Sequence, residues 1–511
     1  MSIAATADRP MLKHVGTVAV LAAVFAGALV LTLALRPWGF VHHDTSEVVM
    51  WAQSGWVAGF WKHPPFLPWL TRLWSGVMPM GPLSLSLLTA LNMTMCAAAV
   101  QQIAALGDPE RRGATRGLTL LLLACLPYAT FMAIKLNHNT ILISLWPLTT
   151  LAFLRALDKP TALRGILFGI AAAAAVLAKY YSLLLLAGCV AASVASMPRA
   201  WRFYRSAAPY MTIVAFVVAL APHLLWLMEN QGSSAKFPFV VGANALASEA
   251  RGPLAALKFA VLAPAVVLPL LILFGLLWRH ARVEGEPTRV HRFEREVLVL
   301  TLVPYVLTAL FIAAFNMHGP VVWAIPVFLC LPALAAVRLG RLRSRVLGRL
   351  IAGCGIVIAI ITVIGPFGVR TAISRGVDGI SDPRQDIAIT ATGLWRAATG
   401  MPLRLVGGDS RLTSAATLFS PDRPQGWPAF DHHLAPWVSA TTATRDGFVG
   451  LCRSNDAACL AQAERLGAGQ TIIRCPLKRQ ISYLGAVGPV FKADVIMVLP
   501  VSARAVPCPV E

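Results

Sequence analysis

Charge is scarce in this sequence of 511 residues: only 13% are Asp, Glu, Lys or Arg, whereas 57% are hydrophobic. Charged side chains are absent altogether from long stretches at 15–35, 117–134, 206–228, 259–278, 297–315, 321–337 and 350–369. A helix that crosses a bilayer needs about 20 apolar residues. Several stretches reach that length, so the scarcity of charge favours a membrane protein over a soluble one.

The apolar stretches also lack the alternation of apolar and polar residues that is typical of membrane β-strands. Helices satisfy their own backbone hydrogen bonds in lipid, so we predict a polytopic α-helical membrane protein. With Arg9 and Lys13 on the inner side, we count about eleven transmembrane helices. We place them near 15–35, 82–104, 117–134, 138–155, 163–178, 180–197, 207–228, 259–278, 296–315, 321–337 and 350–369.

Acidic residues are few: 23 Asp and Glu face 44 Lys and Arg, and the net charge is +21. A nucleic-acid platform would need stacking aromatics among the basic residues, and these are missing. Instead, the basic residues form short clusters between the apolar stretches, and in this topology all the clusters lie inside. They occupy 111–116, 155–164, 199–205, 279–295 and 338–349. We therefore predict contacts with membrane lipids and no nucleic-acid partner.

The first apolar stretch lacks a small-residue cleavage site, so we interpret it as a retained helix. We assign 1–369 to a transmembrane domain. Residues 370–511 alternate apolar stretches with Gly, Pro and charge, which predicts a small soluble α/β domain. Within it, PLRLVGG (402–408) is typical of a buried strand with a glycine turn, and AACLAQAERLGAG (457–469) of a helix with a glycine stop. An odd number of spanning helices places this domain outside.

The cysteines do not show the two close pairs of a typical zinc site. Of nine, five lie in or beside apolar stretches, where a small buried hydrophobe is expected. Four in the C-terminal domain are disulfide candidates: Cys452, Cys459, Cys475 and Cys508. Cys452 and Cys459 are the easiest pair to propose, across the short polar loop RSNDAA.

Ionisable residues gather in one segment, HHDTSEVVMWAQSGWVAGFWKHPPF at 42–66, directly after the first predicted helix. Four further outer loops carry Lys, His, Asn, Tyr or Glu. Taken singly, each of these residues is equally well explained as an interfacial or snorkelling side chain. Together they place polar groups from five loops at one face of the membrane. Ionisable groups at membrane depth are costly, so this convergence indicates a functional site.

These residue types suit sugar transfer from an anionic, lipid-linked donor. Lys62, Lys135 and Lys179 can neutralise a phosphate as point charges. Asp44 can take a proton from an attacking hydroxyl that lies within hydrogen-bond reach. A base on the acceptor and cations on the departing phosphate are the main requirements of such a reaction.

The order of features in this segment resembles the GT-C superfamily of integral-membrane glycosyltransferases. It runs from an apolar helix to Asp, an amphipathic stretch with Trp-Ala, His-Pro-Pro and a second helix, as HDTSEVVMWAQ…WKHPPFLPWL. Three later segments also fit: NHNTILISLWPLTTLAFLRAL, GILFGIAAAAAVLAKYYSLLLL and HLLWLMENQGSSAKFPF. The soluble GGDSRLTSAATLFSPDRP resembles the outer C-terminal domain of bacterial members. Over most of its length the chain is similar to glycosyltransferase family 39, in its protein-O-mannosyltransferase-like and aminoarabinose–lipid A transferase-like branch.

The resemblance implies inverting transfer of a hexose or pentose from a polyprenyl-phosphate donor, on the periplasmic face of the bacterial inner membrane. The acceptor would be lipid A, the lipopolysaccharide core, another glycan or a protein. Asp44 matches the family's catalytic Asp. The family's following Glu is Thr45 here, and the second acid is Glu47. The expected donor-phosphate ligands are Lys62, His63, Lys179 and Lys135. The expected substrate-binding residues are His42, His43, Asn137, His138, Tyr180, Tyr181, Glu229, Asn230 and His318.

This chemistry requires no cofactor. The imidazoles and carboxylates of His42, His43, Asp44 and Glu47 are ligand types for a divalent cation. Because His beside a carboxylate equally suits acid–base work, we predict no metal.

A transporter and a receptor are the two other classes of function to compare with this prediction. A transporter or flippase of an anionic lipid or lipid-linked sugar is the alternative hypothesis. It predicts internal repeats and broken or charged helices at mid-membrane. The sequence shows no clear repeat, and its polar groups lie at the outer edge. A receptor would leave the loop residues unexplained.

Overall fold

The structure is a computed structural model of the chain, and it describes residues 8–36, 40–237, 250–268, 270–272, 275, 288–339, 344–377 and 379–500. The chain forms two compact units. The first comprises Met1–Thr32, Lys62–Phe66 and Leu87–Val363, and the second comprises Leu33–Trp61, Leu67–Ser86 and Ile364–Glu511. The predicted division at 369/370 differs from these units in 33–61, 67–86 and 364–369.

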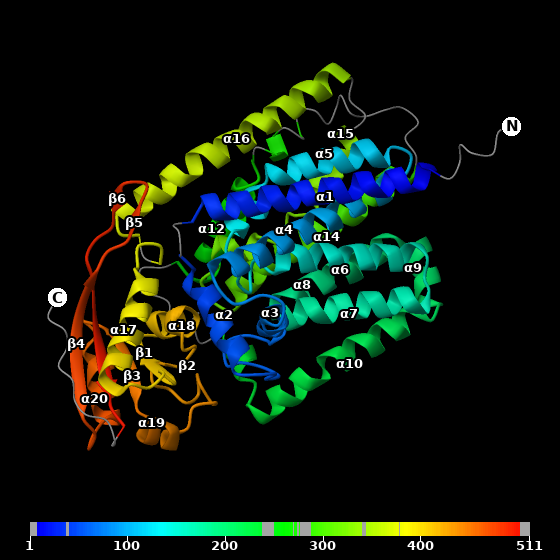
Figure 1. The fold of residues 1–511 in the computed structure, drawn as a ribbon. Helices are drawn as coiled ribbons and strands as arrows, with labels where there is room; N and C mark the ends of the chain where they lie inside the picture. Colours follow the sequence, from blue (N-terminus) through cyan, green and yellow to red (C-terminus); the bar gives the residue numbers. More distant parts are fainter. Residues whose placement is uncertain are drawn as a thin grey trace. The chain divides into compact units, whose positions relative to one another are not determined.

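The first unit is helical. Among the described residues its helices, three of which extend into the second unit, are α1 (Asp8–Ala34), α4 (Pro82–Gly107), α5 (Arg112–Ala124), α6 (Leu142–Asp158), α7 (Ala162–Ala178), α8 (Leu183–Ala195), α9 (Met197–Tyr204), α10 (Ala208–Glu229), α12 (Gly252–Ala265), α14 (Thr288–Ala314), α15 (Leu331–Leu339) and α16 (Ser344–Ser374). Helices α6, α7 and α10 lie side by side, as Figure 1 shows. Helices α8 and α14 pack against each other in the same way.

Two glycines explain the close approach of α7 and α10. A Cβ at Gly165 would collide with the carbonyl of Ala208, and one at Gly169 with the carbonyl of Thr212. The hydroxyl of Thr212 also donates to the carbonyl of Gly165 at 3.0 Å. Small residues four apart let helix backbones come together in a membrane, where packing replaces the hydrophobic effect.

Four helical segments in the described part of the chain are long and apolar enough to cross a membrane: Pro82–Gly107, Ala208–Glu229, Arg289–Ala314 and Ile351–Ser374. A fifth crossing is possible if Arg112–Ala124 and Pro127–Ala133 form one span, although they are bent by 88°. The predicted total of about eleven therefore stays a prediction. What the structure establishes is a mostly helical chain with several apolar helices.

Two of the predicted transmembrane helices are not continuous helices in the structure, and that each stretch crosses the membrane stays a prediction. The stretch 117–134 ends as α-helix at Ala124, since Pro127 disfavours helical backbone at the residue before it. The stretch 321–337 contains only the short η4 (Val321–Ala324) before α15 begins. Pro326 has no N–H to donate, which prevents a continuous helix there.

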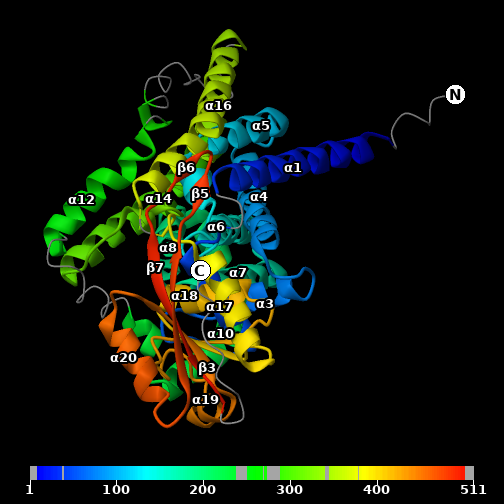
Figure 2. The ribbon, with the colours of Figure 1, turned by 60° about the vertical axis from the view of Figure 1, so that its left-hand side comes forward.

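The second unit contains a five-stranded sheet. Its strands are β1 (Leu405–Gly408), β2 (Gln425–Pro428), β3 (Phe448–Arg453), β4 (Ile472–Arg479) and β7 (Phe491–Val498), in the order β2-β1-β3-β7-β4. β1 runs parallel to β2 and β3, whereas β7 is antiparallel to β3 and β4. Between β4 and β7 the chain makes a small hairpin of β5 (Ser482–Tyr483) and β6 (Ala486–Val487), which is clear in Figure 2. The predicted small α/β domain is confirmed.

Helices cover both faces of this sheet. They are α17 (Arg384–Thr399), α18 (Ser410–Phe419), α19 (Ala440–Asp446) and α20 (Ala457–Leu466), and the unit also holds α2 (His43–Gln53) and most of α3 (Phe66–Ser75). Successive strand residues point to opposite faces. Val406 packs in one core with residues of α17 and α18, and Leu405 in a second core with Ala463 of α20.

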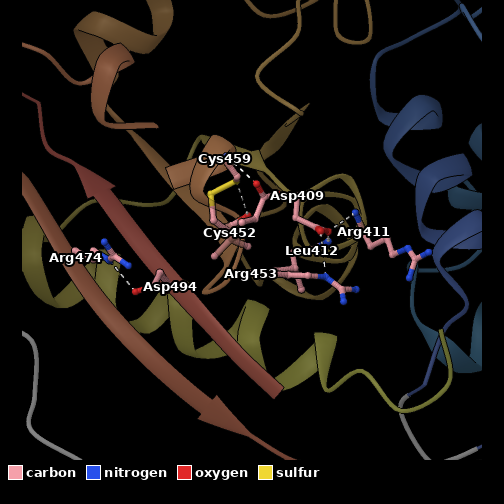
Figure 3. Close-up of a disulfide and its surroundings, with 10 residues drawn as sticks. Asp409, Arg411, Leu412, Cys452, Arg453, Cys459, Arg474 and Asp494 are labelled. Carbon is pink, nitrogen blue, oxygen red and sulfur yellow. Dashed lines mark hydrogen bonds and ion pairs between the residues drawn. A yellow bond between two sulfur atoms is a disulfide. The ribbon is translucent and has the colours of Figure 1, made fainter. Parts of the chain in front are cut away.

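The short motifs of this domain fold as predicted. PLRLVGG forms β1 and ends at Gly408, whose φ of +108° few other residues adopt. Asp409 then caps α18, accepting the backbone N–H groups of Arg411 and Leu412 at 2.8 and 3.1 Å (Figure 3). AACLAQAERLGAG forms α20, which stops at Gly467.

A disulfide joins Cys452 to Cys459, the pair proposed from the sequence (Figure 3). Cys475 is also disulfide-bonded, and Cys508 lies outside the described residues. The cysteines of the apolar stretches are free, as expected: Cys96, Cys125, Cys189, Cys330 and Cys354.

The ion pair between Arg396 and Asp422 makes the stability of this domain depend on pH. The hydrogen bond from the Arg396 guanidinium lowers the pKa of the Asp422 carboxyl below its usual value. A lowered carboxyl pKa stabilises the fold above the unfolded-state value of about 3.9, and that stabilisation is lost as the pH falls further. We expect Asp422→Asn to lower the melting temperature by a few degrees at pH 7, and the gap from the wild type to narrow as the pH falls below about 4.

Differential scanning fluorimetry of the purified chain measures this effect. Asn at position 422 can still accept the backbone N–H of Leu403, which Asp422 binds at 2.7 Å, so the comparison isolates the charge. A gap that stays constant from pH 7 to pH 3 would contradict the assignment.

Candidate functional site

Asp44 lies in the first turn of α2, where two histidines surround it. His43 Nε2 lies 2.9 Å from Oδ1 of Asp44, and His42 Nδ1 lies 3.5 Å from Oδ2. His42 also caps the helix, because its Nδ1 accepts the backbone N–H of Asp44 at 3.2 Å. The proton of a neutral His42 is therefore assigned to Nε2. The carboxylate is about one quarter exposed, which leaves it accessible to a substrate.

The α/β domain holds this turn in place. Ser46 Oγ lies 3.1 Å from Ser414 Oγ, and Gln53 donates to the carbonyl of Thr417 at 3.0 Å. Both partners belong to α18, against which α2 packs. Every side chain from Val48 to Ala52 is buried. Asp44 therefore sits on a rigid support, which suits a group that must meet its substrate in a fixed orientation.

The second acid of the segment is Glu47. It lies one helical turn after Asp44, so both carboxylates project from the same side of α2. Thr45, the residue directly after Asp44, is only 1% exposed. An acid at that buried position would be costly without a partner. The half-buried position 47 instead carries the second carboxylate of the segment.

The same turn contains a set of possible metal ligands. One ligand atom from each of His42, His43 and Asp44 lies within 4.8 Å of the others. Glu47 does not belong to this set. His43 Nδ1 is buried and has no hydrogen-bond partner among the described residues. The donor types suit zinc, and they suit a hydrogen-bonded acid–base pair equally well.

The first unit contains a second group of candidates, which we call the lysine–histidine cluster: Lys62, His63, His138, Asn139 and Lys179. The rings of His63 and His138 stack with centroids 3.9 Å apart. His138 Nδ1 lies 3.0 Å from the carbonyl of Ala178, the residue before Lys179. These contacts bring together three segments, at 62–63, 138–139 and 178–179, that are far apart in the sequence.

Lys179 is held by polar and aromatic partners. It follows the last residue of α7, and its ammonium donates to the side-chain carbonyl of Asn139. The Nζ atom lies 5.9 Å from the ring centroid of Tyr181 and 5.5 Å from that of Trp323. Aromatic faces attract a cation. The ammonium is therefore fixed by its neighbours rather than extended into solvent.

The tyrosines of this unit make hydrogen bonds that the sequence did not reveal. Tyr180 Oη lies 2.6 Å from His223 Nε2 and 2.7 Å from Ser234 Oγ. Tyr181 Oη lies 2.8 Å from Thr308 Oγ1. His223 is only 1% exposed and was missed, because a stretch free of formal charge was taken as uniformly apolar. An imidazole within a predicted membrane helix was the signal that could have found it.

The remaining candidates lie in loops and at a helix end of the first unit. Asn137 is buried, and its side-chain oxygen accepts the backbone N–H groups of Asn139 and Thr140, which shapes the loop. Lys135 lies at the start of that loop. Glu229 and Asn230 are exposed at the end of α10, where the Asn230 amide donates to its own helix. His318 lies between α14 and η4.

Comparison with known proteins identifies the fold. Residues 62–226 match the family described as dolichyl-phosphate-mannose-protein mannosyltransferase. The structure is similar to ArnT from Cupriavidus metallidurans bound to undecaprenyl phosphate, with 17% identity, a TM-score of 0.62, and coverage of 95% of this chain and 98% of that one. The apo form of ArnT matches at 15% identity and a TM-score of 0.60, with the same coverage. No curated protein matches the sequence significantly.

At this level of identity the likeness to ArnT establishes the fold. It extends over nearly the whole of both chains, including the C-terminal sheet domain. The family match covers the part of the first unit that carries the lysine–histidine cluster. The chain is a multi-pass membrane protein, and its resemblance to the GT-C superfamily of glycosyltransferases is confirmed.

Proposed function

We propose that this protein is an inverting glycosyltransferase that moves a sugar from a polyprenyl-phosphate donor to an acceptor of the cell envelope. The observation that carries the proposal is the Asp44 carboxylate, which lies 2.9 Å from a histidine nitrogen on an anchored helical turn. The fold supports it, since the similar ArnT structure contains undecaprenyl phosphate. The matching family is named for transfer from dolichyl-phosphate-mannose.

The reaction needs one base on the acceptor. Asp44 takes the proton of an acceptor hydroxyl while that oxygen attacks the anomeric carbon of the donor sugar. The bond from this carbon to the phosphate oxygen breaks, and polyprenyl phosphate leaves with the bonding electrons. A single displacement of this kind inverts the anomeric configuration. His43, by donating its Nε2–H to Asp44, orients the carboxylate.

The departing phosphate needs positive charge. Lys179 supplies it, since Asn139 and the two aromatic rings fix its ammonium before the substrate arrives. Cations placed in advance where negative charge develops lower the barrier without reorganising during the reaction. Lys62 and His63 are the next donors to the phosphate, and Lys135 contributes from the neighbouring loop.

The proposed acceptor is lipid A, the lipopolysaccharide core, another glycan or a protein, on the periplasmic face of the inner membrane. Mass spectrometry of envelope glycolipids from a strain without this protein tests the function. We expect one species to lose the mass of a single hexose or pentose. The wild-type gene should restore that mass, whereas the gene with Asp44→Asn should not. Unchanged glycolipids and glycoproteins in the deletion strain would refute the function.

The proposed chemistry uses no metal, which gives a separate prediction. We expect dialysis against EDTA to leave the transfer rate within a factor of about two, because a carboxylate base and lysine cations are sufficient. The measurement is the rate of transfer from a radiolabelled donor before and after dialysis. Loss of activity that zinc or manganese restores would instead assign His42, His43 and Asp44 as metal ligands.

A further inference from the structure

A pocket in the second unit lies beside the segment that carries Asp44. It is formed by Phe40 and Val41, the start of α17 at 382–389, Phe419 at the end of α18, and residues 480–482 before and in β5. Its volume is about 270 Å³. Pockets that bind drug-sized ligands measure roughly 300–1,000 Å³. The pocket lies just below that range, which suits a small ligand such as a single sugar ring.

The charged residues of this pocket balance one another. Asp382 Oδ2 lies 3.8 Å from Arg384 Nε and 3.6 Å from Arg453 Nη2. At the rim, Asp386 lies 2.8 Å from Arg479 Nε. Arg453 Nε also lies 3.3 Å from Asp409 Oδ2, so three arginines are paired with three acids and these pairs leave no net charge. This arrangement disfavours a phosphate group and a metal cation, and it favours an uncharged ligand.

The remaining lining combines apolar and hydrogen-bonding surfaces. Phe40 is fixed by the Arg384 guanidinium, which lies 5.4 Å from its ring centroid, and Phe419 lines the pocket as well. Gln385, Gln480 and Ser482 add two amides and a hydroxyl. These groups can both donate and accept hydrogen bonds. A sugar ring has the same combination, with C–H faces that pack on aromatic rings and hydroxyls at its edge.

The pocket lies close to Asp44, the proposed base of the reaction. Val41 lines it, and Asp44 follows three residues later on α2. Three residues span at most about 11 Å even when fully extended, which a short oligosaccharide can bridge. The fixed pairs around Asp382 and Arg384 keep the start of α17 in place beside this segment, and Arg384 also donates to the carbonyl of Gly379 at 2.7 Å.

The geometry points to a sugar-binding subsite of the acceptor: the pocket holds an uncharged ring of the acceptor glycan and so presents a neighbouring hydroxyl to Asp44. This inference rests on the proposed function and narrows it, since it selects a glycan or glycolipid acceptor over an unmodified protein. A single sugar ring in such a pocket binds weakly, with dissociation constants on the order of millimolar.

Saturation-transfer NMR on the full chain in nanodiscs tests the subsite, with methyl α-mannopyranoside, methyl β-galactopyranoside and methyl β-arabinopyranoside as probes. We expect at least one probe to bind the wild type, and Gln480→Ala or Ser482→Ala to weaken it by roughly tenfold through the loss of one hydrogen bond. Gln462→Ala is the matched control, because it removes an amide on α20 that does not line the pocket. Binding of no probe, or equal binding by Gln480→Ala and Gln462→Ala, would overturn the proposal.

Two competition experiments distinguish an acceptor sugar in this pocket from a donor sugar and from an anion. Undecaprenyl-phosphate-mannose should leave the glycoside signal unchanged, and its displacement of the glycoside would assign the pocket to the donor instead. Inorganic phosphate should also have no effect, and competition by phosphate would show an anion site. Asp44→Asn should keep glycoside binding while losing transfer. Transfer that survives Asp44→Asn would remove Asp44 as the base, and absence of transfer by the wild type would remove the proposed function; glycoside binding would leave the sugar subsite standing in both cases.

Discussion

Replacing Asp44 with Asn is expected to lower the rate of sugar transfer by a factor of roughly 10²–10⁴, the usual contribution of a general base. Asn has nearly the same shape but cannot take up the proton of the acceptor hydroxyl. The anchoring of α2 through Ser46 and Gln53 does not involve this carboxylate, so the variant should insert and fold normally. The measurement is single-turnover transfer from a labelled polyprenyl-phosphate sugar, together with thermal unfolding of the same sample.

Glu464→Gln is the matched control for this experiment, because it makes the same change from carboxylate to amide on the exposed side of α20. It should leave transfer unchanged. If Asp44→Asn transfers sugar at a rate similar to Glu464→Gln, Asp44 is not the base. A flippase would form no transfer product with the wild type or with either variant, so the same assay also separates the proposed enzyme from a flippase.

Replacing Lys179 with Met is expected to lower kcat/KM for the lipid-linked donor by roughly 10²–10³, as removal of one preorganised charge-stabilising group does. Met keeps an unbranched, apolar side chain beside Tyr181 and Trp323 while removing the ammonium. The departing phosphate then lacks the cation that the proposed mechanism assigns to it. Initial rates over a range of donor concentrations, at saturating acceptor, measure the effect.

Lys159→Met provides the control, since Lys159 is an exposed lysine at the end of α6, in a loop that the sequence places on the inner side. It should leave kcat/KM unaltered. A second comparison is Asn139→Ala, which removes the hydrogen-bond partner of Lys179 and keeps the charge. We expect a smaller loss there. An equal loss in Lys179→Met and Lys159→Met would show that Lys179 does not act on the donor.

The amino-acid composition of the apolar stretches was enough to predict the class of protein. Apolar stretches long enough to cross a bilayer are visible in the composition, because transfer of each residue to lipid depends mainly on its own side chain. Interruptions within those stretches were harder to predict. Pro127 and Pro326 break helices, whereas Pro222 and Pro304 are accommodated inside α10 and α14. Proline alone therefore did not decide where a helix ends, since neighbouring groups can compensate for the missing N–H.

The candidate site was predicted in part. Asp44 and its two histidines are adjacent in the sequence, so their proximity followed from local helix geometry. The sequence placed His63, His138, Asn139 and Lys179 on the same face of the membrane. It did not predict which of them touch: His63 stacks on His138, and Lys179 donates to Asn139. Asn137 was expected to bind substrate. In the structure its side-chain oxygen instead accepts backbone N–H groups of its own loop. Glu229 and Asn230 lie at an exposed helix end.

The amino-acid sequence by itself determined the membrane character, the small α/β domain and the first-turn cluster at 42–44, because each depends on composition or on neighbours along the chain. Only the tertiary structure decided that α2 is anchored on α18, and that His223 meets a tyrosine 43 residues before it. Such pairings depend on which helices pack together and in what register. That choice is made by the shapes of many side chains at once, and no local pattern records it.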